Sequence, residues 1–228
     1  MIFCATANAA SIIQDTEIES VITEIIKPVT DVAGVPNAKT GGNAKVFAWY
    51  PGQAGGTALA RLLFGEKNFS GHLPVTFYRD VTDLPPFEDY SMENRTYRYF
   101  TGTPLYPFGY GLSYTSFKLT GAVTEKHTVR AEIINDGNMQ GDALVQVYVR
   151  CDSPFAPVHP RLCGFGRVSL EPGQKKTAEI PLDPLTDSVI SDTGETVKAE
   201  SYTLYVGLSQ PDERSVSMGG VQPVVISK

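Results

Sequence analysis

The sequence has few of the residues that build metal sites or disulfide frameworks. It holds three cysteines and three histidines in 228 residues, and their spacing matches no common set of metal ligands. We therefore predict no metal site. Cys151 and Cys163 could form a disulfide if their strands are adjacent, but two buried free thiols are favoured. No G-x-G-x-x-G fingerprint is present, so no nucleotide cofactor is expected.

Long apolar runs and an excess of basic residues are also lacking. The chain has 19 Lys and Arg against 25 Asp and Glu, a formal net charge of −6, which argues against nucleic-acid binding. No apolar run approaches the roughly 18 residues of a membrane span. The start, "MIFCATANAA", has small residues but no basic region before them, so we predict no signal peptide. The sequence does not indicate the cellular compartment of the protein.

What the sequence does contain divides into three zones with different patterns. Residues 1–44 are atypical: "DTEIESVITEIIKP" predicts an amphipathic helix that Pro28 ends. Residues 45–115 alternate short apolar runs, one helix pattern and turns. Within them, "AKVFAWY" and "GHLPVTF" predict strands, with a helix between them that Thr57 caps and Gly65 ends. This order predicts part of an α/β layer.

Residues 116–228 predict an all-β domain. Seven strand candidates are separated by turns such as "NDGNMQGD", "EPGQ" and "SDTGE". In "VQVYVR" the valines at 145, 147 and 149 face one way, and Gln146, Tyr148 and Arg150 the other. Short strands at this spacing predict an antiparallel β-sandwich of the immunoglobulin type. The strand candidates are "FKLTGAV", "HTVRAEIIN", "ALVQVYVR", "CGFGRVSL", "KKTAEIPL", "ESYTLYVG" and "VQPVVIS".

Several separated motifs resemble one family. The run from "AWYPGQAGGTALARLLFGEKNFSGHLPVTF" to "YPFGYGLSYTSF" resembles the C-terminal part of the α/β sandwich domain of family 3 glycoside hydrolases. The fibronectin type III-like domain that follows in many members is resembled by three later runs: "INDGNMQGDALVQVYVR", "RLCGFGRVSLEPGQKKTAEIPL" and "ESYTLYVG". Residues 45–210 carry the likeness. Two departures, Phe69 for the usual Pro and His72 for a frequent Arg, are interpreted as changes in surface turns.

This resemblance implies a retaining β-glycosidase whose catalytic groups lie elsewhere. The family's nucleophile is an Asp on an N-terminal (β/α)8 barrel, in a motif ending Ser-Asp-Trp, and no such tripeptide occurs here. The general acid usually precedes "WYPGQ", but residues 1–44 hold no convincing counterpart. Glu17, Glu19 and Glu24 are expected on the polar face of the predicted helix. The implied partner is therefore a barrel domain, in cis or on a separate chain, and the implied substrates are β-linked glucosides or xylosides.

Other carboxylates in the sequence do not replace that pair. Glu88, Asp89 and Glu93 cluster in a proline-rich loop, where acidic groups are normally solvated or cap turns, whereas a catalytic carboxyl needs partial burial. The remaining candidates, Ser70, His72 and Asp80, lack the G-x-S-x-G elbow of a hydrolase triad. We predict no catalytic residue in this chain.

The aromatic stretch "NRTYRYFTGTPLYPFGYGLSY" at residues 94–114 has two interpretations. Alternation in "TYRYF" would place Tyr97 and Tyr99 on one face, and Arg98 and Phe100 on the other. In the first interpretation the rings form a sugar platform, with Tyr97, Arg98 and Tyr99 as the candidate binding residues. Alternatively, the rings form a seam between the α/β zone and the β-sandwich, which is the favoured interpretation.

Three hypotheses about the whole chain follow. The favoured one is the C-terminal portion of a β-glycosidase that is inactive alone. The second is a non-catalytic carbohydrate-binding or interaction module that uses residues 97–114. The third is a gene fragment whose incomplete α/β layer, residues 45–115, exposes apolar surface and aggregates or dimerises.

Overall fold

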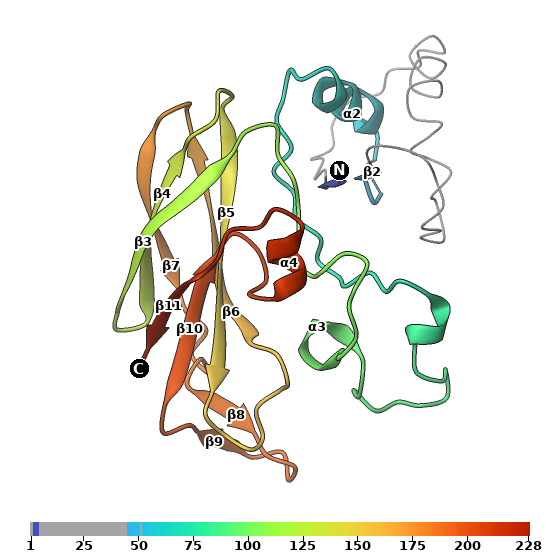
Figure 1. Ribbon diagram of the computed structural model, residues 1–228, viewed down its shortest axis with the longest axis vertical. Helices are drawn as coiled ribbons and strands as arrows, with labels where there is room; N and C mark the ends of the chain where they lie inside the picture. The colour runs from blue at the N-terminus through green and yellow to red at the C-terminus, as the bar shows by residue number, and fades with distance from the viewer. Residues whose placement is uncertain (1, 5–44, 51) are drawn as a thin grey trace.

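Figure 1 shows the chain as a computed structural model, which describes residues 2–4, 45–50 and 52–228. The helix predicted within "DTEIESVITEIIKP" lies outside these ranges, as do Glu17, Glu19 and Glu24. Among the described residues, no helix is long and apolar enough to cross a membrane. The domain boundaries 1–44, 45–115 and 116–228 stay predictions.

The C-terminal part is a sandwich of two antiparallel sheets. One sheet has the strand order β11-β10-β5-β6 and the other β3-β4-β7. Each of the seven strand candidates forms one of these strands, so the predicted all-β sandwich is confirmed. The bounds are β3 (Phe117–Glu125), β4 (Thr128–Asn135), β5 (Gly141–Cys151), β6 (Arg161–Leu170), β7 (Lys175–Pro181), β10 (Tyr202–Gly207) and β11 (Val224–Ser227).

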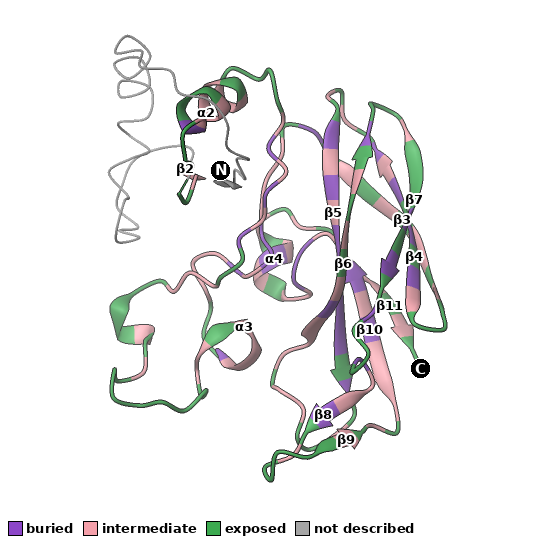
Figure 2. Ribbon diagram, turned by 180° about the vertical axis from the view of Figure 1, so that it is seen from behind, coloured by how far each residue is buried: buried purple, intermediate pink, exposed green. Residues whose placement is uncertain are grey.

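The sandwich holds the main core of the described chain. Its buried apolar side chains run from Val129 to Val206, and they come from both sheets. Val145, Val147 and Val149 all point into this core and are at most 2% exposed, as their alternation predicts. Each fully buried aliphatic side chain stabilises the fold by about 1.5–3 kcal/mol. Figure 2 shows how the buried segments concentrate on these strands.

Three short elements lie beside the sandwich strands. β8 (Ser188–Ile190) and β9 (Thr196–Lys198) form a hairpin at one end of the sandwich. Its "SDTGE" loop was predicted as a turn, but the two strands were not predicted. The third element, α4 (Glu213–Ser217), joins β10 to β11. Asp212 caps α4 by accepting a hydrogen bond from the backbone N–H of Ser215, at 2.7 Å.

The α/β part has little regular structure. β1 (Ile2–Cys4) pairs in parallel with β2 (Lys45–Phe47), so the strand predicted in "AKVFAWY" is confirmed. Next comes helix α2 (Gly55–Leu63), followed by a single 3-10 turn, η1 (Val81–Asp83), and a one-turn helix, α3 (Thr96–Tyr99). A partial α/β region followed by an all-β sandwich is therefore the observed fold class.

Two local predictions in this region are wrong. Helix α2 begins at Gly55, before Thr57, and its N-cap is Ala54 with no side-chain hydrogen bond. The end of α2 is as predicted, because Gly65 has a φ of 73°. The segment "GHLPVTF" forms no strand. It pairs with other segments only through isolated bridges, such as the one between Phe77 and Tyr106.

The two family departures do not lie in surface turns, which corrects their interpretation. Phe69 is fully buried, packs against Val46, Leu62 and Leu112, and contacts the Tyr114 ring edge-on with centroids 5.3 Å apart. His72 is partly exposed, and burial around its imidazole lowers its pKa to about 4. Phe69 is therefore a core residue of the α/β part, and His72 is partly buried.

Candidate functional site

The aromatic stretch packs directly onto the sandwich, and Tyr97 makes the central contacts. Its ring stacks on Phe108 with centroids 4.3 Å apart, and it meets Tyr148 of β5 edge-on at 6.2 Å. The Tyr97 hydroxyl accepts a hydrogen bond from the backbone N–H of Leu162, at 2.9 Å. We call this contact zone, residues 97–110 against β5 and β6, the seam.

A buried polar layer lies beneath the seam. Gln146 Nε2 donates to the carbonyl oxygens of Gly109, at 2.9 Å, and Leu208, at 3.2 Å. The Tyr148 hydroxyl donates to Gln146 Oε1 at 2.7 Å. Gln146 is 3% exposed and Tyr148 is fully buried, so β5 is covered on both faces along this stretch. These contacts of Tyr97 and Gly109 with β5 and β6 support the favoured interpretation of the aromatic stretch as a seam.

Arg98 and Tyr99, the other two candidate binding residues, follow Tyr97 in α3. Because residues 96–99 form a helical turn, the predicted alternation of "TYRYF" is wrong. The Arg98 guanidinium lies 5.9 Å from the Tyr97 ring centroid. The backbone carbonyl oxygen of Arg98 accepts a hydrogen bond from the backbone N–H of His159, at 3.1 Å. Both residues line an outer groove of about 540 Å³ together with Tyr78, Met92 and Phe108.

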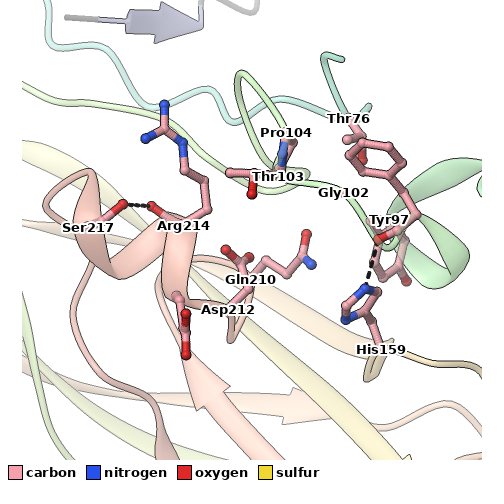
Figure 3. A pocket seen from close by; sticks show the side chains of 12 residues that line it. Thr76, Tyr97, Gly102, Thr103, Pro104, His159, Gln210, Asp212, Arg214 and Ser217 are labelled. Carbon is pink, nitrogen blue, oxygen red and sulfur yellow. Dashed lines mark hydrogen bonds between the residues drawn. The ribbon is translucent and has the colours of Figure 1, made fainter. Parts of the chain in front are cut away.

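A second cavity, of about 450 Å³, lies between the seam and α4. Figure 3 shows its walls: Thr76 and residues 102–104 on one side, and Gln210, Asp212 and Arg214 on the other. His159 Nε2 donates to the Phe100 carbonyl oxygen at 2.8 Å, which closes one end. Sequence reasoning missed this cavity, because its polar residues come from segments more than a hundred positions apart.

The carboxylates of the described residues have the wrong environment for glycoside hydrolysis. None of these Asp and Glu residues is buried. Where a carboxyl pKa is shifted, it is lowered, as for Asp89, which accepts a 2.8 Å hydrogen bond from the Ser91 N–H. Glu88 and Glu93 are exposed. The cluster at 88–93 is therefore solvated and caps a turn, as predicted.

The other nucleophile and metal candidates are also placed. Asp80 caps η1 by accepting from the Thr82 N–H at 3.0 Å. Cys151 and Cys163 are buried free thiols, as favoured, and burial raises the pKa of Cys163 to about 12. In the part of the chain that the structure describes, no three His, Cys, Asp or Glu side chains group as a metal site.

Residues 49–92 expose an unusual number of large apolar side chains, which we call the apolar strip. Tyr50 is 99% exposed, Phe87 87% and Tyr90 89%. Apolar side chains exposed singly are common on protein surfaces, and such side chains mark an interaction site only where they are contiguous. The strip comprises Trp49, Tyr50, Phe64, Val75, Val81, Leu84, Phe87, Tyr90 and Met92.

Two family models match consecutive parts of the chain. The glycosyl hydrolase family 3 C-terminal domain matches residues 21–114, and the fibronectin type III-like domain matches residues 143–210. The first of these matches includes α2 and the whole aromatic stretch, and the second spans β5 to β10.

The chain is also similar to characterised or named glycosidases. The chain is 46% identical over 147 residues to a xylan 1,4-β-xylosidase of Xylanibacter ruminicola, covering 61% of this chain and 17% of that enzyme. It is 36% identical to a periplasmic β-glucosidase of Salmonella typhimurium, over 62% of this chain and 21% of that protein.

Solved structures agree with these matches. A β-glucosidase of Bifidobacterium adolescentis superposes with a TM-score of 0.67 at 29% identity, over 83% of this chain and 31% of that one. The chain thus spans less than a third of the length of these relatives. It belongs to the family 3 glycoside hydrolases and corresponds to their C-terminal part, in which the end of the α/β sandwich domain precedes a fibronectin type III-like domain.

Proposed function

We propose that this chain is the supporting C-terminal portion of a β-glycosidase that cleaves β-linked glucosides or xylosides. The nucleophile would lie on a (β/α)8 barrel, in cis or on a separate chain, and the general acid in the part of the α/β sandwich that precedes "WYPGQ". The described residues would hold the α/β layer against the sandwich and offer a surface for the barrel. The names of the relatives, β-xylosidases and β-glucosidases, support the substrate class.

The carboxylate environments carry this proposal. A retaining glycosidase needs two carboxyl groups about 5–5.5 Å apart, and the general acid needs a raised pKa. A raised pKa requires burial or a neighbouring negative charge. Among the described residues, no carboxyl group is buried. The carboxyl pKa values that are shifted, those of Asp80, Asp89, Glu132, Asp136 and Asp187, are all lowered, chiefly by hydrogen bonds. This part of the chain therefore suits support rather than acid–base chemistry.

The apolar strip supports a docking role. Side chains such as Tyr50 and Phe87 would bury large areas against a partner, and aromatic anchors dominate the binding energy of protein interfaces. The sandwich has a core of its own, although it also exposes large apolar side chains such as Phe165 and Val225. The partner proposed for the strip is the remainder of the family enzyme, the barrel in particular.

The first test is an activity assay of the purified chain on 4-nitrophenyl β-xyloside and β-glucoside. We expect no turnover above the buffer rate. Robust turnover that co-purifies with the chain would contradict the proposed supporting role.

A chimera tests the role positively. Residues 45–228 of this chain would replace the matching part of the Xylanibacter ruminicola β-xylosidase, to which the chain is 46% identical. We expect a soluble enzyme whose kcat/KM stays within about tenfold of the parent, because the nucleophile and the general acid both precede the exchanged part and stay those of the parent. A second chimera with Tyr50→Ser and Phe87→Ser in the apolar strip should lose solubility or activity. If both serine changes were neutral, the docking role would fail.

A second candidate function is carbohydrate binding at the outer groove. The observation that favours it is the position of Arg98 and Tyr99 beside Tyr78 in that groove. Titration with xylo- and cello-oligosaccharides tests it, and Tyr99→Ala should abolish any binding seen. Tyr97→Ala is a poor probe, because that ring also holds the seam together.

A further inference from the structure

Two arginines line a hollow that has no carboxylate in its walls. The hollow, of about 230 Å³, lies between α3, the loop that follows β5, and β8. Neither Arg98 nor Arg161 forms an ion pair with a described residue. We call this surface the basic hollow, and its two guanidinium groups favour a partner that carries carboxylates. The other residues that line it are Tyr99, Phe155, Pro157, Leu185, Ser188, Val189 and Ile190.

The basic hollow also exposes apolar side chains that share one surface. Phe155, Leu185 and Ile190 are each at least 39% exposed, and all three line the hollow. Arg161 is held beside them, because its Nη2 donates a hydrogen bond to the Leu185 carbonyl oxygen at 2.7 Å. Contiguous exposed apolar side chains with arginine among them are typical of protein–protein interfaces.

The same chain carries a loop of the complementary character. Residues 84–93, "LPPFEDYSME", which we call the anchor loop, contain three acidic residues and no basic one. Glu88, Asp89 and Glu93 are exposed, as are the rings of Phe87 and Tyr90. Figure 1 shows that the segment between η1 and α3 projects away from the sandwich. The anchor loop therefore offers rings and carboxylates where the basic hollow offers apolar side chains and guanidinium groups.

The base of the anchor loop is held in one conformation. Tyr78 fixes it, because its hydroxyl donates to the Asn94 carbonyl oxygen at 3.3 Å and accepts from the Thr96 N–H at 3.2 Å. The Arg95 guanidinium group donates to three carbonyl oxygens of the loop, those of Pro86, Asp89 and Ser91. A loop that is ordered before binding loses little conformational entropy when a partner contacts it.

We propose that two copies of this chain associate by placing the anchor loop of each copy in the basic hollow of the other. Phe87 and Tyr90 pack against the apolar walls of the hollow, and Glu88 pairs with Arg98. Because each copy carries both surfaces, one two-fold axis makes the two contacts at once, which is the usual symmetry of homodimers. The dimer does not rest on the proposed function. A barrel that covered Phe87 would displace the second copy, so the dimer belongs to the chain without a barrel.

Sedimentation velocity of the full chain, at concentrations from about 1 to about 200 μM, measures the association. We expect a monomer–dimer equilibrium with a Kd on the order of 1–100 μM, because each copy contributes only one loop and one hollow. A chain that stays monomeric up to about 200 μM would overturn the proposal. A continuous series of larger oligomers would overturn it as well, since a closed two-fold contact stops at the dimer.

Charge reversal identifies the contact. Arg98→Glu and Glu88→Arg should each weaken the dimer at least about tenfold, because each variant places like charges together in both contacts. An equimolar mixture of the two variants should associate about as well as the wild type, since the mixed dimer has one native pair and one swapped pair. Glu171→Arg, at an exposed position after β6, is the matched control and should leave the Kd unchanged. A mixture that associates no better than the single variants would overturn the proposal.

Serine substitutions separate the anchor loop from the rest of the apolar strip. Phe87→Ser should raise the Kd of the dimer at least about tenfold. Phe64→Ser removes an equally large ring, 67% exposed at the end of α2, and should leave the Kd unchanged. Equal losses in both variants would mean that the whole strip associates without specificity, which would overturn the proposal. The association of this chain and the activity of the chimera are separate measurements, so either proposal can fail while the other stands.

Discussion

The two regions of this chain differ in where their apolar side chains go. The sandwich turns its own inward: 16 buried residues between Val129 and Val206 form one cluster. In the α/β part the corresponding cluster has a single fully buried member, Phe69, while the apolar strip faces solvent. The sandwich thus has a core of its own, and it also exposes large apolar side chains such as Phe165 and Val225. The α/β part is held by the sandwich on one side and offers an unsatisfied surface on the other.

The seam joins the two regions, and at Gly109 the backbone of the α/β part comes close to the side chains of β5. The Gly109 carbonyl accepts from Gln146, and a Cβ built at Gly109 would overlap the polar ends of Gln146 and Tyr148. Gly109 also has a φ of 73°, a conformation that costs other residues about 1–2 kcal/mol. Only glycine meets both conditions.

The largest predicted effect is therefore that of Gly109→Ala. Combining backbone strain with overpacking of about 1–3 kcal/mol, we expect a loss of about 3–4 kcal/mol in the free energy of unfolding by urea. Gly173→Ala is the matched control, because Gly173 has a φ of 74° with nothing within 4 Å of its Cβ position. It should lose about 1 kcal/mol. Equal losses in both variants would mean that the seam is not tightly packed.

Acid should weaken the α/β part through His72. Its pKa is about 4 in the folded protein, against 6.5 for the free side chain, because burial disfavours the charged form. The unfolded chain thus binds a proton that the folded chain resists. Stability is full above pH 6.5 and falls as the pH drops toward 4, by about 3 kcal/mol in total.

Urea unfolding across that pH range measures the effect. His72→Met should flatten the decline, whatever its stability at neutral pH. His127→Gln, at an exposed position in the sandwich, should leave the decline unchanged. An equally steep decline in His72→Met would show that other groups control acid sensitivity.

A smaller effect is expected for the polar layer beneath the seam. Tyr148→Phe removes the hydroxyl that donates to Gln146 Oε1 and leaves that buried oxygen unpaired, which should cost about 1–2 kcal/mol. Tyr205→Phe, on the neighbouring strand β10 and only half-buried, should cost less than about 0.5 kcal/mol. A neutral Tyr148→Phe would mean that water replaces the lost bond.

The sandwich was predictable because its evidence is local. Alternating side chains in β4, β5 and β7 and glycine-rich turns between strands mark each element without knowledge of its partners. β8 and β9 were missed because three residues cannot display a period. The strand predicted in "GHLPVTF" does not form, because the segment pairs only through isolated bridges such as that between Phe77 and Tyr106. The sequence alone cannot reveal whether a partner strand lies beside a segment.

The seam and the cavity were only partly predictable for a related reason. Alternation in β5 correctly separated Val145 from Gln146, but it could not show that the polar face is also covered. That depends on Gly109 and Tyr97, which lie some forty residues away. The turn at Tyr97 overrides the strand pattern of "TYRYF" because its hydroxyl and ring are fixed by Leu162 and Phe108.

The most direct test of this account is amide hydrogen exchange on the wild-type chain and on Gly109→Ala. In the wild type, the buried N–H groups of Leu73 and Gly109, which bond across residues 73–110, should be protected. In Gly109→Ala their protection should be lost, while β4 and β5 stay protected, because the sandwich core does not need the α/β part. If β4 and β5 lost protection together with Leu73, or if Leu73 kept its protection, the claim that a self-sufficient sandwich holds a dependent α/β part through the seam would be wrong.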